Sequence, residues 1–215
     1  MGRKSLVESP RGDRVTDEKA WVLQVQQGND EAFTQLVETY QKPVYNLCYR
    51  MLGEPESAED AAQETFLRAY QNLHRYDASR AFGTWLLSIA AHYCIDLLRK
   101  KKFAMFSLDA ENDDGATFEL PDASALDPEI ESVKREQRDR LHLLLKNLDA
   151  TDRAAVIMRY WYDFSEVEIA TSLNLTVSAV KSRLHRSRRA LAGMWQEETT
   201  PSARPERRVY ESPAF

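Results

Sequence analysis

The sequence predicts an all-α protein in which two small helical domains are joined by a flexible acidic linker. Apolar residues recur every three or four positions along most of the chain, which is the period of an amphipathic helix. No stretch alternates Val, Ile and Thr between hairpin turns, as a half-buried sheet would require. Nine acidic residues lie between Asp109 and Glu131 without a Lys or Arg, and Gly115, Pro121 and Pro128 interrupt regular structure there.

Composition limits the classes of function that the chain can have. The 215 residues carry a formal net charge of −5, so any nucleic-acid surface must be local. No apolar run reaches membrane-spanning length, and the N-terminus lacks a signal-peptide core, so we expect a cytoplasmic protein with no membrane partner. Cys48 and Cys94 lie in apolar helical settings and are expected to be buried free thiols.

The first domain is expected to span residues 17–102, after a polar and disordered N-terminus at 1–16. Helices are expected to start at Thr16 or Asp17, at Asp30 and at Ser57, and to end at Gly28 and Gly53. Pro43 permits a break or a new first turn. The helix after Ser57 should turn Ala62, Phe66, Tyr70 and Leu73 inward. A loop then leads to a long helix from Phe82 to about Lys102, with Phe82, Leu86, Ile89, Tyr93 and Leu97 buried.

The second domain is expected to span residues 129–195, after a linker at 103–128 and before a disordered tail at 196–215. Fully extended, the linker would reach roughly 80 Å at about 3.3 Å per residue. One helix should include Leu141, Leu144 and Leu148, and Asp149 or Thr151 should start the next.

A helix–turn–helix closes the second domain, in the stretch YDFSEVEIATSLNLTVSAVKSRLHRSRRAL at 162–191. Ser165 with Glu168 forms a candidate capping box, and Val167, Ile169, Ala170 and Leu173 should be buried behind it. Asn174 suits the turn, and Thr176 caps the second helix. That helix should bury Val177, Val180, Leu184 and Leu191 and present polar and basic residues outward.

The outward face of this second helix fits a DNA major groove, because Ser178–Leu191 contains Lys and Arg but no Asp or Glu. A solvated amphipathic helix is the alternative interpretation. The predicted DNA-facing residues are Ser178, Lys181, Ser182, Arg183, His185, Arg186 and Arg189.

Catalytic chemistry is not predicted. The chain has 7 Gly residues and no glycine-rich phosphate loop. Its His residues (His74, His92, His142 and His185) do not stand at metal-ligand spacing from the two cysteines. The acidic residues fall in the linker, which has no scaffold to hold paired carboxylates. We therefore expect no enzyme, no catalytic residues, no metal and no cofactor.

Two stretches together resemble one family. The first is SAEDAAQETFLRAYQNLHRYDASRAFGTWLLSIAAHYCIDLLRKKK at 57–102, and the second is the helix–turn–helix. In this order and across an acidic linker, the chain resembles a bacterial RNA polymerase sigma factor of the extracytoplasmic-function group. The resemblance implies sigma region 2 in the first domain and sigma region 4 in the second, with no middle sigma domain.

The resemblance also implies partners and binding faces. The helix after Ser57 would dock on the clamp helices of the largest polymerase subunit, and region 4 on the flap of the second largest. The docking residues implied are Asp60, Gln63, Glu64, Leu67 and Arg68. The family would also imply promoter DNA as a ligand and an anti-sigma factor as a regulator. The linker would thread the polymerase channels as a mimic of nucleic acid, although its charge is also explained by solubility.

The loop from Tyr76 to Phe82 resembles the family's segment that captures a base flipped from the minus-ten element, and the following helix resembles the one that melts and reads that element. The implied minus-ten residues are Tyr76, Asp77, Ser79, Arg80, Phe82, Thr84, Ser88, His92, Arg99 and Lys100. Trp85 is expected to pack instead. The family commonly has Asn where His92 stands, which leaves the base preference there open.

Two rival functions fit part of the sequence. A stand-alone regulator of the LuxR type has a similar C-terminal helix–turn–helix, but it would bring a strand-containing receiver or ligand-binding domain. A helical enzyme with an appended DNA-binding domain would need a catalytic constellation. The resemblance therefore implies a promoter-recognition subunit that reads minus-ten DNA with its first domain and minus-thirty-five DNA with its second.

Overall fold

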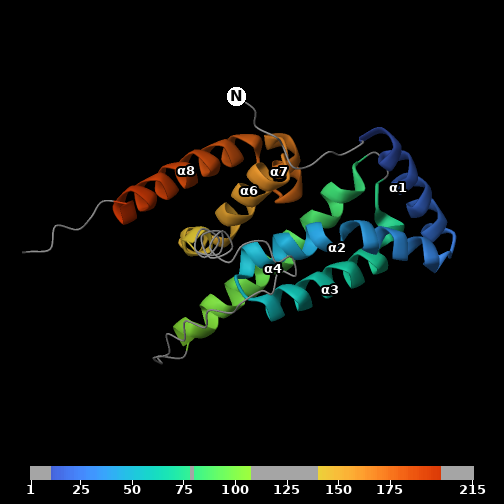
Figure 1. Ribbon diagram of the computed structural model, residues 1–215, viewed down its shortest axis with the longest axis horizontal. Helices are drawn as coiled ribbons and strands as arrows, with labels where there is room; N and C mark the ends of the chain where they lie inside the picture. The colour runs from blue at the N-terminus through green and yellow to red at the C-terminus, as the bar shows by residue number, and fades with distance from the viewer. Residues whose placement is uncertain (1–10, 78–79, 108–139, 200–215) are drawn as a thin grey trace, which may run out of the picture.

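The computed structural model describes residues 11–77, 80–107 and 140–199, and all regular structure in these ranges is helical (Figure 1). The first half contains α1 (Arg11–Gln26), α2 (Asp30–Leu52), α3 (Pro55–Asn72), a 3-10 turn η1 (Leu73–Arg75) and α4 (Phe82–Ser107). The second contains a helix at 140–146, α6 (Ala150–Trp161), α7 (Glu166–Ser172) and α8 (Val177–Thr199). The all-α fold class is confirmed. Residues 103–107 of the predicted linker belong to α4, and the rest of the linker, much of the N-terminus and most of the tail lie outside the described residues.

Several helix ends differ from the sequence prediction. α1 begins at Arg11, before the expected cap at Thr16 or Asp17. Asn29 rather than Asp30 caps α2, because the Asn29 side chain accepts a 3.1 Å hydrogen bond from the backbone N–H of Glu31. α3 begins at Pro55, since proline suits a first helical position, and Ser57 instead donates to the Glu54 carboxylate at 3.0 Å. Gly53 ends α2 as predicted, with φ +82°.

Pro43 does not break α2, contrary to one expectation from the sequence. The helix is continuous through it, although Pro43 has no N–H to donate to the preceding turn. Leu36 before it and Val44 and Leu47 after it are buried in the same core. This shared burial holds the two parts of the helix in line.

The core of the first half is formed by α2, α3 and α4, with α1 packed on α2. The buried side of α3 consists of small residues: Ala58, Ala61, Ala62, Thr65 and Ala69. They allow the neighbouring helices to approach closely. Tyr70, expected to point inward, is instead 43% exposed and donates to Asp30 at 2.7 Å.

Cys48 of α2 and Cys94 of α4 are both buried, free thiols, as predicted, and they contact each other in this core. α4 continues to Ser107, past the expected end near Lys102, and its most buried face is shifted toward Leu87, Ala90, Ala91 and Ile95. Ile89, Tyr93 and Leu97 are only partly buried.

The second half packs directly on the first. Figure 1 shows α6 and α7 beside α2 and α4, with α8 along the outer edge. Buried residues of both halves form a single hydrophobic cluster. α8 continues beyond Trp195 to Thr199. In the described part of the chain, none of the helices has the length and apolar character needed to cross a membrane.

Candidate nucleic-acid interface

The helix–turn–helix is built by local hydrogen bonds that the sequence predicts. The Ser165 hydroxyl accepts from the Glu168 backbone N–H at 3.2 Å, and the Glu168 carboxylate accepts from the Ser165 N–H at 2.8 Å. This is the predicted capping box. The backbone φ of Asn174 is +54°, the left-handed conformation expected at the turn. Thr176 then caps α8 by accepting from the Ala179 N–H at 3.1 Å.

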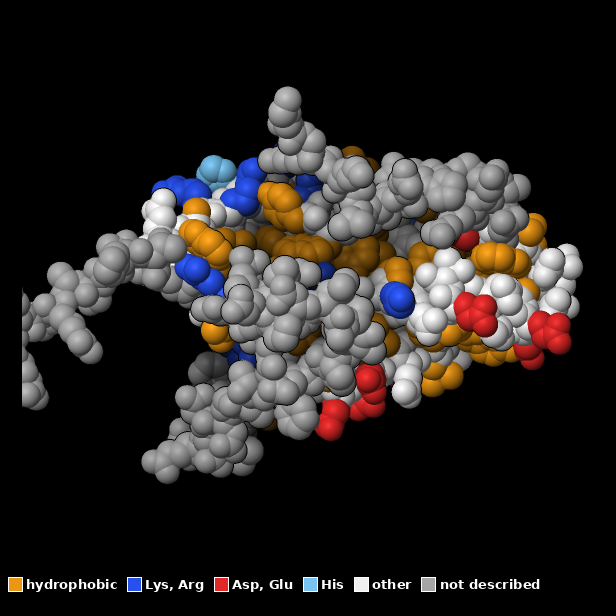
Figure 2. All heavy atoms as spheres, in the orientation of Figure 1, with side chains coloured by type: hydrophobic (Ala, Val, Ile, Leu, Met, Phe, Trp, Pro, Cys, Tyr) orange, Lys and Arg blue, Asp and Glu red, His pale blue; other side chains and the backbone are white. Residues whose placement is uncertain are grey.

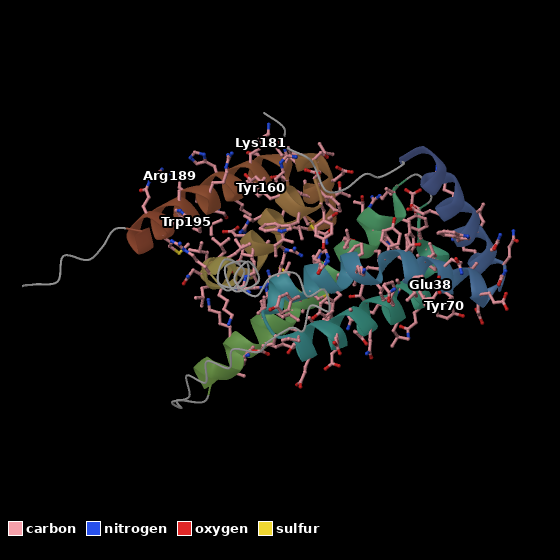
Figure 3. The ribbon with its side chains drawn as sticks, in the orientation of Figure 1. Glu38, Tyr70, Tyr160, Lys181, Arg189 and Trp195 are labelled. Atoms are coloured by element: carbon pink, nitrogen blue, oxygen red, sulfur yellow. The ribbon has the colours of Figure 1, made fainter. Side chains whose placement is uncertain are left out.

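Packing fixes which face of α8 reaches solvent. Val180, Leu184 and Ser187 are buried, whereas the opposite strip is exposed: Ser178, Lys181, Ser182, His185, Arg186 and Arg189. Figure 2 shows Lys, Arg and His side chains gathered over α8. In Figure 3, Lys181 and Arg189 project from the outer edge of this helix. We call these six exposed residues the α8 face.

Arg183 does not share the orientation of the α8 face. It turns toward α6, where its guanidinium donates to the Asp152 carboxylate at 2.5 Å. Both side chains are mostly buried. Of the seven residues predicted to face minus-thirty-five DNA, Arg183 is therefore the one that holds the helix in place. Val167, predicted to be buried, is 62% exposed on α7.

A polar cavity of about 640 Å³ lies beside the α8 face, between α6, α7 and α8. Its lining adds Arg159, Tyr160 and Arg188, which sequence reasoning did not select. Arg188 follows Lys181 by seven residues on the same helix, so the helical period alone brings it to this side. Glu166 also lines the cavity and pairs with Lys181 at 3.6 Å.

The loop predicted to hold a flipped base is anchored by aromatic residues. Tyr76 and Phe82 are 8% and 2% exposed, and their rings pack edge-to-face with centroids 5.6 Å apart. Trp85 packs against both rings, which agrees with the packing role expected for it. The Tyr76 hydroxyl donates to the Arg80 carbonyl at 2.5 Å, across the loop. Tyr76 and Phe82 thus shape the loop rather than project from it.

The remaining minus-ten residues are spread along α4 and the loop. Asp77 and Arg80 are exposed, and Ser79 lies outside the described residues. Thr84, Ser88 and His92 are partly buried at successive turns of α4, and Arg99 and Lys100 are exposed farther on. The His92 ring nitrogen Nδ1 lies 2.9 Å from the Ser88 carbonyl. These residues therefore follow one side of α4.

The predicted docking face of α3 is open to solvent. Asp60, Gln63, Leu67 and Arg68 are exposed, and Glu64 is partly so. Arg68 forms a 2.7 Å ion pair with Glu64, and its guanidinium lies 4.6 Å from the centre of the Tyr93 ring. Leu67 is 52% exposed and adds an apolar side chain to this otherwise polar face.

A groove of about 470 Å³ runs beside this face, between α3 and α2. Val37, Gln41 and Tyr45 line it from α2, together with Gln63 and Phe66 from α3. The α2 residues of this groove are not among the site residues predicted from the sequence. Their spacing of four residues puts them on one helical side, and that is the signal that would have found them.

Comparison with known proteins matches both halves to one family. The Sigma-70 region 2 family matches residues 36–104, and the Sigma-70 region 4 family matches residues 138–191. The chain is 39% identical over 176 residues to the ECF RNA polymerase sigma factor SigW of Bacillus subtilis, which covers 80% of this chain and 94% of SigW. It is 31% identical to the RNA polymerase sigma factor CnrH of Cupriavidus metallidurans, over 80% of this chain and 90% of CnrH.

Solved structures agree on the fold. CnrH, in complex with the cytosolic domain of CnrY, superposes with a TM-score of 0.63 at 23% identity, over 85% of this chain and 99% of CnrH. The sigma factor RpoE of Bartonella quintana, in complex with the anti-sigma factor NepR, gives a TM-score of 0.59 at 19% identity, over 76% and 96% of the two chains. The match to region 2 sets aside a regulator of the LuxR type. The chain belongs to the extracytoplasmic-function group of the sigma-70 family, the RNA polymerase subunits that direct transcription initiation.

Proposed function

We propose that three faces of this chain divide the work of a sigma factor. The α3 face of Asp60, Gln63, Glu64, Leu67 and Arg68 binds the clamp helices of core RNA polymerase. The loop after Tyr76 and the adjoining side of α4 open and read the minus-ten element. The α8 face reads the minus-thirty-five element, and region 4 also contacts the polymerase flap.

The α8 face carries this proposal. It presents six exposed polar or basic residues without a carboxylate among them, on a helix whose opposite side is fixed by Val180 and Leu184. A helix held in this way can enter a major groove and place Arg guanidinium groups against base edges. The neighbouring Arg159 and Arg188 extend the positive charge to the flanking phosphates.

The roles of Tyr76 and Phe82 differ from those of the other minus-ten residues. Because both rings are buried, we assign them to shaping the loop, while exposed Asp77 and Arg80 meet the DNA. His92, Ser88 and Thr84 then contact the melted strand along α4. This division predicts that substitutions at Tyr76 or Phe82 lower stability as well as promoter opening.

Regulation by an anti-sigma factor is part of the proposal. Sigma factors CnrH and RpoE were each solved in complex with another protein, the cytosolic domain of CnrY and the anti-sigma factor NepR. We infer a comparable partner for this chain, which works in the cytoplasm as an initiation subunit and has no enzymatic activity of its own.

Reconstitution with bacterial core RNA polymerase tests the function. Purified chain and core enzyme are mixed with a library of random promoter fragments, and transcripts are sequenced. We expect initiation from fragments that share two short motifs, one near minus ten and one near minus thirty-five. Core enzyme alone is the control. Transcripts without a shared motif, or no dependence on the added chain, would contradict the proposal.

A further inference from the structure

Helix α1 lies outside the part of the chain that the Sigma-70 region 2 family matches, since that match begins at residue 36. It nevertheless packs on the rest of the first half. Figure 1 shows α1 beside the loop that leads into α4. Val22 of α1 is 2% exposed and joins the hydrophobic core, and Gln26 donates to the Leu73 carbonyl at 2.9 Å, in the turn just before the loop. α1 is therefore attached to one end of this loop.

Tyr40 of α2 attaches α1 to the other end of the loop. Its hydroxyl donates to the Glu18 carboxylate of α1 at 2.6 Å, and its ring meets the Phe82 ring edge-to-face with centroids 5.5 Å apart. Burial and this hydrogen bond raise the pKa of Tyr40 well above its usual value, so the hydroxyl stays protonated and donates. Phe82 is the first residue of α4, directly after the loop. Tyr40 thus connects Glu18 to the residue at which the loop ends.

Gly83 leaves the space that Tyr40 needs. A Cβ at Gly83 would stand 2.8 Å from Cε1 and 2.9 Å from the hydroxyl oxygen of Tyr40, which is closer than such atoms pack. Glycine therefore allows the first turn of α4 to lie directly on the Tyr40 ring. This contact sets the distance between α2 and the start of α4.

The Glu18 carboxylate also acts on the residue at which the loop begins. Burial raises the pKa of Tyr76, and the negative charge of Glu18 adds to that rise, which places the carboxylate near both tyrosines. The Tyr76 ring in turn packs on Phe82. One carboxylate of α1 therefore lies close to the aromatic groups at both ends of the loop.

We propose that α1 braces the base-capturing loop, and that Glu18 is a positioning residue that acts through Tyr40 on Phe82. The inference rests on the proposed function of the loop in the minus-ten element. A carboxylate is repelled by phosphates, so Glu18 serves as the acceptor for Tyr40 rather than as a DNA contact. The brace holds Tyr76 and Phe82 in place before a base arrives, so less ordering is needed when the base is captured.

Binding of holoenzyme to single-stranded minus-ten DNA separates positioning from general stability. The probes are oligonucleotides that carry the minus-ten motif recovered from the promoter library, each with one base replaced by an abasic site. With the unmodified chain, the abasic site that weakens binding most marks the captured base. We expect Glu18→Ala to weaken binding to the intact strand about tenfold, which is the lower end of what a hydrogen bond to a charged group contributes. Binding to the strand that lacks the captured base should be nearly unchanged.

Conservative changes show whether the hydrogen bond is the cause. Glu18→Gln keeps an acceptor oxygen and should bind the intact strand nearly as well as the unmodified chain. Tyr40→Phe keeps the ring and should reproduce the loss seen with Glu18→Ala. Gly83→Ala pushes on the same ring from α4 and should act in the same direction. Glu38→Ala, at an exposed position of α2, is the matched control and should bind every probe normally.

Equal weakening of Glu18→Ala on intact and abasic strands, or none on either, would overturn the brace, because base capture would then not depend on Glu18. Equal losses by Glu18→Ala and Glu18→Gln would overturn the role of the hydrogen bond. If Glu18→Ala binds core polymerase poorly, Tyr40→Phe takes its place, and the same deficit in both variants would also overturn the proposal. An unmodified chain that responds to no abasic site would instead contradict base capture itself, and this inference with it.

Discussion

Arg183 on α8 donates a hydrogen bond to Asp152, 31 residues earlier on α6, instead of joining the exposed α8 face. The pair ties α8 to the helix beneath it. Its neighbours Ser182 and Arg186 belong to the exposed α8 face. Adjacent positions on one basic helix therefore have different tasks, one structural and the others available for DNA.

Replacing Arg183 should affect stability. We expect Arg183→Ala to lower the free energy of unfolding by about 1.5–3 kcal/mol, because it leaves the largely buried Asp152 carboxylate without its charged partner. Urea denaturation followed by Trp fluorescence measures this. Arg186→Ala is the matched control and should leave the midpoint unchanged. A coupling energy near zero in a double-mutant cycle with Asp152→Ala would contradict the role of the pair.

Arg186 and Arg189 should differ in how they recognise DNA. We expect Arg186→Ala to lose about 1–3 kcal/mol of discrimination at one base pair, as for a bidentate base contact. Arg189 lies nearer the end of the helix that would leave the groove. Arg189→Ala should therefore weaken binding to all sequences alike, and it should reduce the salt dependence of binding by about one charge. Holoenzyme binding to minus-thirty-five variants at several salt concentrations measures both. Equal loss on every variant for Arg186→Ala would rule it out as a base reader.

The α3 face should control assembly with polymerase. We expect the combined change Glu64→Lys and Leu67→Asp to weaken binding to core enzyme, because it reverses a charge and removes an exposed apolar group from one face. Co-purification and competition with the unmodified chain measure this. Glu38→Lys makes the same charge reversal at an exposed position of α2 and should bind normally. Normal binding by the double variant would show that this face does not contribute to polymerase binding.

The capping box should contribute to the stability of region 4. Ser165→Ala removes the acceptor for the Glu168 N–H and should cost about 1 kcal/mol. Val167→Ala, two residues later, should be nearly neutral because its side chain is largely exposed. Chemical denaturation compares the two. A larger loss for Val167→Ala than for Ser165→Ala would contradict the exposed position of Val167 and the importance of the cap.

Ionised Glu54 should contribute a small, pH-dependent amount to the free energy of unfolding. Burial alone would raise the pKa of Glu54, but hydrogen bonds from Ser57 and Lys101 and the charge of Lys146 outweigh it, so the pKa lies below its usual 4.5. A lowered folded pKa stabilises the protein above pH 4.5, and that stabilisation is lost as the pH falls through the folded value. Glu54→Gln should cost about 0.2–1 kcal/mol at neutral pH, as for exposed ion pairs, and nothing in acid. Urea denaturation at several pH values measures this. Glu38→Gln is the control, and its effect on the free energy of unfolding should be small and the same at every pH.

Features encoded by near neighbours were predictable from the sequence. The capping box joins residues three apart, the turn at Asn174 depends on one backbone conformation, and the Thr176 cap reaches three residues ahead. Each depends on local chemistry that propensities capture. The two-part match of such signals also pointed to the correct family.

Features encoded by distant residues were not predictable. Arg153 bonds to Met51 across 102 positions, and no local pattern marks that pairing. The orientation of Arg183 depends on Asp152 in another helix. Tyr70 and Val167 were misplaced for a related reason: apolar periodicity shows which residues are apolar but not which side of a helix its neighbours will cover.

The paired thiols of Cys48 and Cys94 determine how the protein responds to oxidants. Peroxides and disulfides react with thiolates, and the hydrogen bond between Cys94 and Cys48, together with burial, raises the pKa of Cys94 well above its usual value. These are the two cysteines of the whole chain, and both are shielded from solvent. Region 2 must therefore open around α2 and α4 before these thiols can react, so oxidants should modify them only slowly while the chain is folded.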